Sequence, residues 1–101
     1  MIYLTVLLFV KKGKETVFLE YENAVLPILK DYQGLLIHRI RPSHENYIGE
    51  SSEEKPYEIH LISFPSENHF KSYLKDSKRI SFNHLKEESL KLSYLYKGEK
   101  L

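Results

Sequence analysis

The apolar segment at residues 2–10 is the feature that most constrains how this chain can fold. Thr5 is its main polar residue among Val, Leu, Ile, Tyr and Phe. Side chains alternate between the two faces of a strand, so this segment predicts a strand that is covered on both faces. It is far shorter than the roughly 20 residues of a membrane span. Its lysines follow the apolar run and no small-residue cleavage site comes after them, so we expect a buried strand rather than a signal peptide.

The rest of the chain alternates between helical and extended patterns. Apolar residues three and four apart predict a helix over residues 14–32, with Pro27 expected to kink it and Gly34 expected to end it. Ser66 and Ser77 are predicted N-caps of helical segments at 66–75 and 78–88. Further strands are predicted at residues 35–41, 57–64 and 90–97, the last with Leu92, Tyr94 and Tyr96 on one face.

This order of elements is β-α-β-β-α-β, which predicts an α+β, ferredoxin-like fold. In that fold a four-stranded antiparallel sheet carries its helices on one face. We expect a single domain over residues 1–101. Two helical segments cover only one face of the sheet, whereas the first and third predicted strands are apolar on both. A second copy packed sheet against sheet would cover the other face, so we expect a homodimer, a dimeric α/β barrel.

Composition excludes several classes of function. The 15 basic and 14 acidic residues are interspersed and give a net charge of +1, so we expect no binding to nucleic acid or membrane. The third strand also lacks the aromatic pattern of RNA-binding sheets. Cysteine is absent, which excludes disulfides, thiolate catalysis and cysteine-zinc sites and is compatible with a cytoplasmic protein. The four glycines are isolated, so no phosphate-binding glycine loop is expected.

Two segments resemble known families of small barrels. Residues 10–39 are similar to first-half segments of NIPSNAP-like proteins, with a Lys-Gly-Lys entry to the helix, a Val-Leu-Pro near its end and a Gly before the second strand. Residues 62–90 resemble an uncharacterised family with a Phe-Pro-Ser after the third strand, here Phe64 to Ser66. An aromatic-x-x-Ser break follows in that family, here Tyr73 to Ser77 with one extra residue.

These resemblances imply the dimeric α/β-barrel superfamily over nearly the whole chain. That superfamily includes cofactor-free monooxygenases, haem enzymes, dehydratases, isomerases and proteins with no known activity. A shared fold therefore leaves the function open.

The candidate catalytic residues come from neighbouring strands. Glu58 and His60 are two residues apart and share one face of the third strand. If Arg41 pairs with Tyr57, His38 lies opposite His60 on that face, although the long connection does not fix this register. A carboxylate beside an imidazole orients it and favours its charged form, so His60 or His38 is a candidate base for proton abstraction. The alternative is that these side chains are hydrogen-bonded and inert near the sheet rim or the dimer seam.

Other residues are candidates for ligand contacts. Arg39 and Arg41 either hold a ligand carboxylate at the barrel mouth or pair with glutamates of the connection. Tyr3 and Tyr94 either line an aromatic pocket or pack at an interface. Two histidines can begin a metal site, but no third ligand is evident, so we expect neither a metal nor another cofactor.

The polar connection at residues 42–56 is long for a hairpin and is predicted to be either a lid or a disordered loop. Two classes of function remain open. The first is a small dimeric enzyme, monooxygenase- or isomerase-like, that acts without a metal on a small organic substrate through a histidine base. The second is a non-enzymatic module that binds a small apolar ligand between the sheet and the helices.

Overall fold

The predicted order of elements is present in the computed structural model, which describes residues 1–43 and 54–101. The possible lid or disordered loop falls mainly on residues 44–53, which lie outside this part of the chain. The elements are β1 (Ile2–Val10), α1 (Glu15–Val25), the 3-10 helix η1 (Leu26–Tyr32), β2 (Leu35–Ile40), β3 (Glu58–Phe64), α2 (Glu67–Leu74), α3 (Ser77–Ile80), α4 (Asn83–Ser89) and β4 (Leu90–Gly98).

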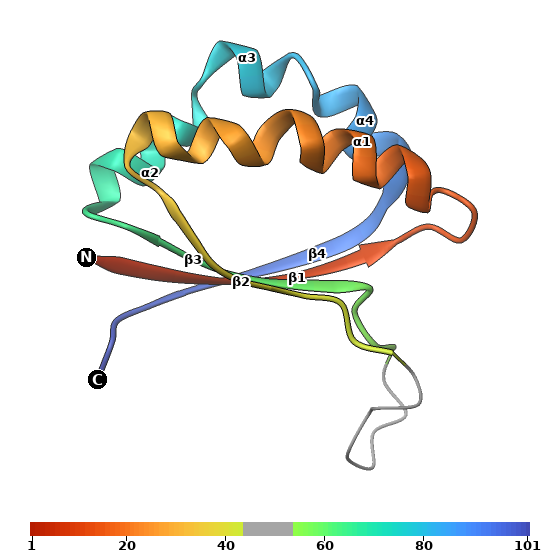
Figure 1. Cartoon of the computed structure of the whole chain (residues 1–101), viewed down its shortest axis with the longest axis horizontal. Coiled ribbons are helices and arrows are strands. Elements are labelled where there is room, and N and C mark those ends of the chain that lie inside the picture. Colours follow the sequence, from red (N-terminus) through yellow and green to blue (C-terminus); the bar gives the residue numbers. More distant parts are fainter. Residues whose placement is uncertain (44–53) are drawn as a thin grey trace.

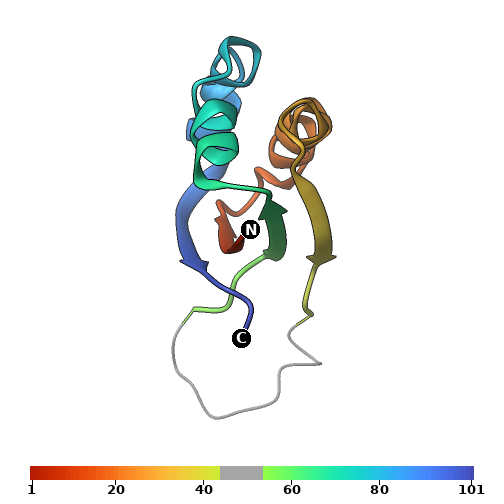
Figure 2. The same ribbon diagram turned by 90° about the vertical axis from the view of Figure 1, so that its left-hand side faces the viewer.

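The four strands form one sheet in the order β2-β3-β1-β4, and each neighbouring pair is antiparallel. The helices lie together above one face of this sheet (Figure 1). Figure 2 shows them as two groups side by side, with α1 in one and α2 to α4 in the other. This is the predicted α+β ferredoxin-like fold. In the described residues no helix is long and apolar enough to cross a membrane.

Strand β1 is central and has apolar side chains on both faces, as its sequence predicts. On the side covered by helices, Leu4 and Leu8 are 1% and 7% exposed. On the other side, Phe9 is buried and makes an edge-on contact with Tyr94, at 5.7 Å between ring centroids. The alternation of β1 therefore serves two layers at once.

Two apolar clusters join the helices to the sheet. Ile28 and Leu29 of η1 pack with Leu4, Phe64 and Tyr73 at one end. The other end is formed by Leu8 of β1 with three residues of α1, namely Phe18, Tyr21 and Val25. The side chains of α1 thus repeat at helical spacing along the sheet and fix how α1 lies on it.

The first helix changes form at Pro27 rather than continuing with a kink. Pro27 stands in the first turn of η1, where its missing N–H and fixed φ are tolerated. The residue that leaves the helix in the left-handed conformation is Gln33, with φ 57°, and not Gly34. Gly34 instead allows a close approach, because an added Cβ would stand 2.8 Å from Phe64 Cε1 and 3.1 Å from Leu29 Cδ2.

The second helical region is divided into three short helices. Ser66 caps α2 as predicted, because its hydroxyl accepts a hydrogen bond from the His69 N–H. The next cap is Asp76 rather than Ser77, since the Asp76 carboxylate accepts from the Arg79 N–H at 2.8 Å. The Tyr32 hydroxyl donates to the same carboxylate at 2.5 Å, so Asp76 also ties α3 to η1.

The face of the sheet turned away from the helices, here called the outer face, carries large apolar side chains. Leu92, Tyr94 and Tyr96 of β4 share this face as predicted, because they pair with Phe9, Leu7 and Thr5. The most exposed members of the outer face, between 42% and 61% exposed, are Leu35, Ile40, Leu92, Tyr94 and Tyr96. Helices do not cover this face in the described part of the chain (Figures 1 and 2).

The close contact at Gly34 yields the first testable prediction. Gly34→Ala pushes a methyl group into Phe64 and Leu29, and we expect a loss of about 1 to 3 kcal/mol in the free energy of unfolding. Urea denaturation measures it. Gly98→Ala is the matched control, because nothing lies within 4 Å of its added Cβ. Equal stabilities of the two variants would contradict this reading of Gly34.

Candidate functional site

A β-bulge in β2 decides which side chains meet at the predicted site. Leu36 pairs with Ile62, as the expected register requires, but one extra residue is inserted before His38. Beyond the bulge Arg39 lies opposite His60, and His38 lies opposite Leu61. Shifting a strand by one residue exchanges its faces, so the prediction that His38 neighbours His60 is wrong.

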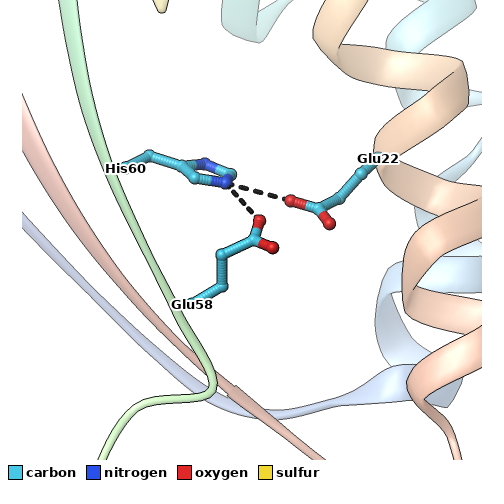
Figure 3. Close-up of side chains that lie close together, drawn as sticks. All are labelled: Glu22, Glu58 and His60. Carbon is cyan, nitrogen blue, oxygen red and sulfur yellow. Dashed lines mark hydrogen bonds and ion pairs between the residues drawn. The ribbon is translucent and has the colours of Figure 1, made fainter. Parts of the chain in front are cut away.

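A buried cluster of two carboxylates and one imidazole stands between the sheet and α1 (Figure 3). Glu58 and His60 come from β3, as predicted, and Glu22 comes from α1. His60 Nε2 lies 2.5 Å from Glu58 Oε2 and 3.0 Å from Glu22 Oε2. The three residues are between 1% and 5% exposed, so water screens these interactions little.

Arg39 of β2 and Arg41, which directly follows that strand, donate hydrogen bonds to the two carboxylates. Arg39 donates to Glu22 Oε1 at 2.9 Å and to Glu58 Oε2 at 3.3 Å. Arg41 donates to Glu58 Oε1 at 2.8 Å and lies over the Tyr57 ring. The predicted arginines therefore pair with Glu22 and Glu58. The two predicted alternatives were a ligand carboxylate at the barrel mouth and glutamates of the connection, and neither describes these contacts.

The oxygens of the two carboxylates are not equally satisfied. Both oxygens of Glu58 accept hydrogen bonds, from His60 and the two arginines. Glu22 Oε2 is buried and accepts no hydrogen bond from the described residues, although His60 Nε2 is close. The Nε2 hydrogen bond of His60 is made to Glu58, which leaves Glu22 Oε2 available to another donor.

This difference moves the pKa values of the two glutamates in opposite directions. Burial raises the pKa of Glu22 above the ordinary 4.5; the neighbouring His60 imidazole opposes this, and the Glu58 carboxylate adds to it. Burial also disfavours the charged form of Glu58, but hydrogen bonds from His60 and Arg41 and the Arg39 charge outweigh it and lower its pKa.

Burial likewise opposes charge on His60, but the two carboxylates outweigh it and raise its pKa above 6.5. Glu22 and His60 therefore both retain protons at a higher pH than a glutamate or a histidine with its ordinary pKa does.

The cluster contains a set of potential metal ligands that the sequence did not reveal. One ligand atom from each of Glu22, Glu58 and His60 lies within 4.8 Å of the others. These residue types suit a divalent cation. However, Arg39 and Arg41 already bring positive charge to both carboxylates, and a dication there would be repelled by them. The electrostatics thus fit proton transfer better than metal binding.

A cavity of about 130 Å³ adjoins this cluster between the sheet and the helices. Glu22 and His60 are part of its wall, and much of the remaining wall is apolar, including Leu4, Val6 and Phe18. A carboxyl group and an imidazole thus border an apolar space large enough for a small molecule.

The other predicted site residues lie elsewhere. Tyr3 and Tyr94 are on the outer face, since they pair with Ser63 and Leu7, and they do not border the cavity. His38 is on the same outer face. The structure therefore brings together Glu58, His60, Arg39 and Arg41, and separates them from His38 and the two tyrosines.

Sequence reasoning missed Glu22, although a signal was present. Phe18, Glu22 and Val25 are four and three residues apart, so the glutamate interrupts the buried stripe of a helix. An acid in such a stripe requires a buried partner, and Arg39 and His60 are those partners.

Comparisons with known proteins place this fold among small ferredoxin-like proteins. No model of a known family matches the chain, and no curated protein matches its sequence. A protein of unknown function from Rhodopseudomonas palustris is similar over 99% of this chain and 82% of its own, with TM-score 0.82 and 14% identity. A NIPSNAP domain protein from Burkholderia xenovorans has TM-score 0.71 and 12% identity, over 100% of this chain and 95% of its own.

Two further similar structures carry descriptions that bear on assembly and activity. One is a dimeric protein of unknown function with a ferredoxin-like fold from Bacteroides fragilis (TM-score 0.69, 11% identity, 98% of this chain and 95% of its own). The other is a candidate antibiotic biosynthesis monooxygenase from Nitrosomonas europaea (TM-score 0.73, 9% identity, 100% and 99%). The predicted resemblance to NIPSNAP-like and dimeric α/β-barrel folds is confirmed, and identities this low show the fold alone.

The raised pKa of His60 predicts how stability changes with pH. The native state keeps the His60 proton above pH 6.5, where the unfolded chain releases it. The free energy of unfolding should therefore fall as pH rises from that value through the native pKa. We expect the His60→Gln variant to lack this decline in the free energy of unfolding, measured by urea denaturation at pH values from 6.5 upward. The exposed His84→Gln is the control and should keep the decline; the same loss in both variants would contradict the assignment to His60.

Proposed function

We propose that this protein is a small isomerase-like enzyme that moves a proton on a small organic molecule bound in the cavity between sheet and helices. The observation that supports the proposal best is the buried Glu22, which lines an apolar cavity and whose Oε2 accepts no hydrogen bond from the described residues. A carboxylate oxygen that contacts His60 but accepts no hydrogen bond in such a place is a suitable proton acceptor.

The proposed step needs no oxidant or reductant. Ionised Glu22 takes a proton from a carbon next to a carbonyl group, and the electron pair of the broken C–H bond moves into an enolate. Glu22 then returns the proton to another position, and His60, 3.0 Å away, exchanges it with solvent. The raised pKa of Glu22 supports this role, because a base works best when its pKa approaches the working pH.

This proposal changes the role first expected of His60. An imidazole between two carboxylates, with its pKa raised, holds its proton and is a poor base. We therefore assign the base to Glu22 and give His60 the task of orienting that carboxyl and relaying its proton. Glu58, with Arg39 and Arg41, is a positioning residue that fixes His60.

Oxygenation is a second candidate, because a similar protein from Nitrosomonas europaea is described as a candidate monooxygenase. Here the same deprotonation would come first, and dioxygen would then react with the carbanion. Consumption of dioxygen, measured with an oxygen electrode, separates this reaction from isomerisation.

Deuterium exchange tests the proton transfer directly. Acetophenone and cyclohexanone are incubated with the protein in D2O, and proton NMR follows the signals next to the carbonyl. We expect exchange that Glu22→Gln slows by at least about 100-fold. Glu67→Gln, which removes an exposed carboxylate, is the control and should exchange like the wild type.

The two classes of function give different results in that experiment. Thermal stabilisation by a ketone without exchange would favour the non-enzymatic binding module over the enzyme. Equal exchange by the wild type and Glu22→Gln would remove Glu22 from the proposed role.

We also propose that the protein is a homodimer that buries its outer face against a second copy. The support is the exposed apolar surface of that face, which is unusual on a monomer, and the dimeric state of the similar protein from Bacteroides fragilis. The cavity lies on the other side of the sheet, so each protomer keeps its own.

A charge on the outer face tests this assembly. Leu7→Glu places a carboxylate at the centre of the outer face, and we expect a folded monomer in light scattering after size-exclusion chromatography. Ile80→Glu, on the exposed side of α3, is the control and should remain a dimer. A dimeric, folded Leu7→Glu variant, or a monomeric wild type, would contradict the proposed interface.

A further inference from the structure

A second group of charges borders the cavity, apart from the cluster around Glu22. Arg79 of α3 and Lys86 of α4 both line it. Arg79 Nε is buried and has no hydrogen-bond partner in the described part of the chain. Its guanidinium lies over the Tyr73 ring, 4.8 Å from the centroid. Among residues 1–43 and 54–101, no carboxylate lies within ion-pair distance of either cation.

This lack of partners contrasts with other lysines of the same region. Lys97 pairs with Glu67 at 2.6 Å and Lys91 with Glu54 at 3.0 Å, although these side chains are about half exposed. Exposed ion pairs add little stability, whereas unpaired charges near an apolar wall are costly. Within the described residues, Arg79 and Lys86 therefore border an apolar wall without the counter-ion that Lys91 and Lys97 have.

The two cations also act on each other. Burial lowers the pKa of Lys86, and the nearby Arg79 charge lowers it further. Two like charges held beside an apolar space are stabilised when an anion enters between them. The side of the cavity formed by α3 and α4 is thus suited to a negatively charged group.

The rest of the cavity limits what that group is attached to. Its volume of about 130 Å³ is close to the ~150 Å³ of an engineered apolar cavity that binds benzene. Its lining includes Leu4, Val6 and Ile62 from the sheet and Val25 and Leu26 from the helices. The space therefore suits an apolar body about the size of one aromatic ring.

We propose that Arg79 and Lys86 bind the carboxylate of a small monocarboxylic acid whose apolar body fills the cavity. A carboxylate is favoured because the planar guanidinium matches its two oxygens, and because most of the residues that line the cavity are apolar. The far side of such a ligand would lie toward Glu22 and His60, and this part of the inference rests on the proposed function. The ligand class is then a carboxylic acid with one ring or a short chain.

Matched pairs of ligands separate the charge from the shape. Benzoate, phenylacetate and hexanoate are each compared with the corresponding neutral amide by isothermal titration calorimetry on the full chain. We expect at least one acid to bind about 10-fold or more tightly than its amide, since hydrogen bonds to charged groups are the stronger ones. Equal affinities of acids and amides, or no binding of any acid at millimolar concentration, would overturn the proposal.

Variants assign the effect to the two cations. Arg79→Gln and Lys86→Met should each weaken binding of the acid by about 10-fold or more and leave binding of the amide unchanged. Lys78→Gln, an exposed cation on the same helix α3, is the control and should bind as the wild type does. Circular dichroism checks folding, and if Arg79→Gln does not fold, Arg79→Lys and Lys86→Met still carry the test.

The outcome is independent of the deuterium-exchange experiment. Tight binding of an acid without any exchange would reject the proposed enzyme and leave the anion site standing. Deuterium exchange on ketones without tighter binding of acids than of amides would support the proposed enzyme and reject the anion site. Tighter binding of inorganic phosphate than of every acid would overturn the assignment of a carboxylate.

Discussion

The site depends on the contacts of Arg39 with two buried carboxylates. Its guanidinium binds Glu22 from α1 and Glu58 from β3, so a single side chain joins the helical layer to the sheet. Removing one partner of a buried ion pair costs about 3 to 5 kcal/mol, because the remaining charge is left without compensation. The orientation of α1, and with it the wall of the cavity, therefore relies on this arginine and on the bulge that places it opposite His60.

Stability alone gives a weak reason for such a cluster. A buried ion network is often no more stable than apolar residues of the same size. Here one oxygen of Glu22 also accepts no hydrogen bond from the described residues, which adds a desolvation cost. Arg79 Nε on the other helical group shows the same feature. Unsatisfied polar atoms of opposite charge, both in residues that line one apolar cavity, are what a site for a small polar ligand requires.

The sheet separates two tasks between its faces. Leu4, Val6 and His60 face the cavity, whereas Leu7, Phe9 and Tyr94 belong to the outer face. Because side chains alternate along a strand, β1 and β3 contribute to both without sharing a residue. Changes on the outer face should thus affect assembly before they affect the cavity, which keeps the two proposals experimentally separate.

Residue patterns alone determined the order of elements, the apolar character of both faces of β1 and the common face of Glu58 and His60, because these follow from local periodicity. The register of β2 on β3 beyond Leu36 was decided by tertiary structure, since one bulged residue places Arg39 instead of His38 opposite His60. Tertiary structure also brought Glu22 to His60 and placed Arg79 and Lys86 on one cavity, because these residues come from helices whose packing on the sheet sets their distances. Periodicity fixes which face a residue takes within its own element, whereas only packing between elements fixes its neighbours.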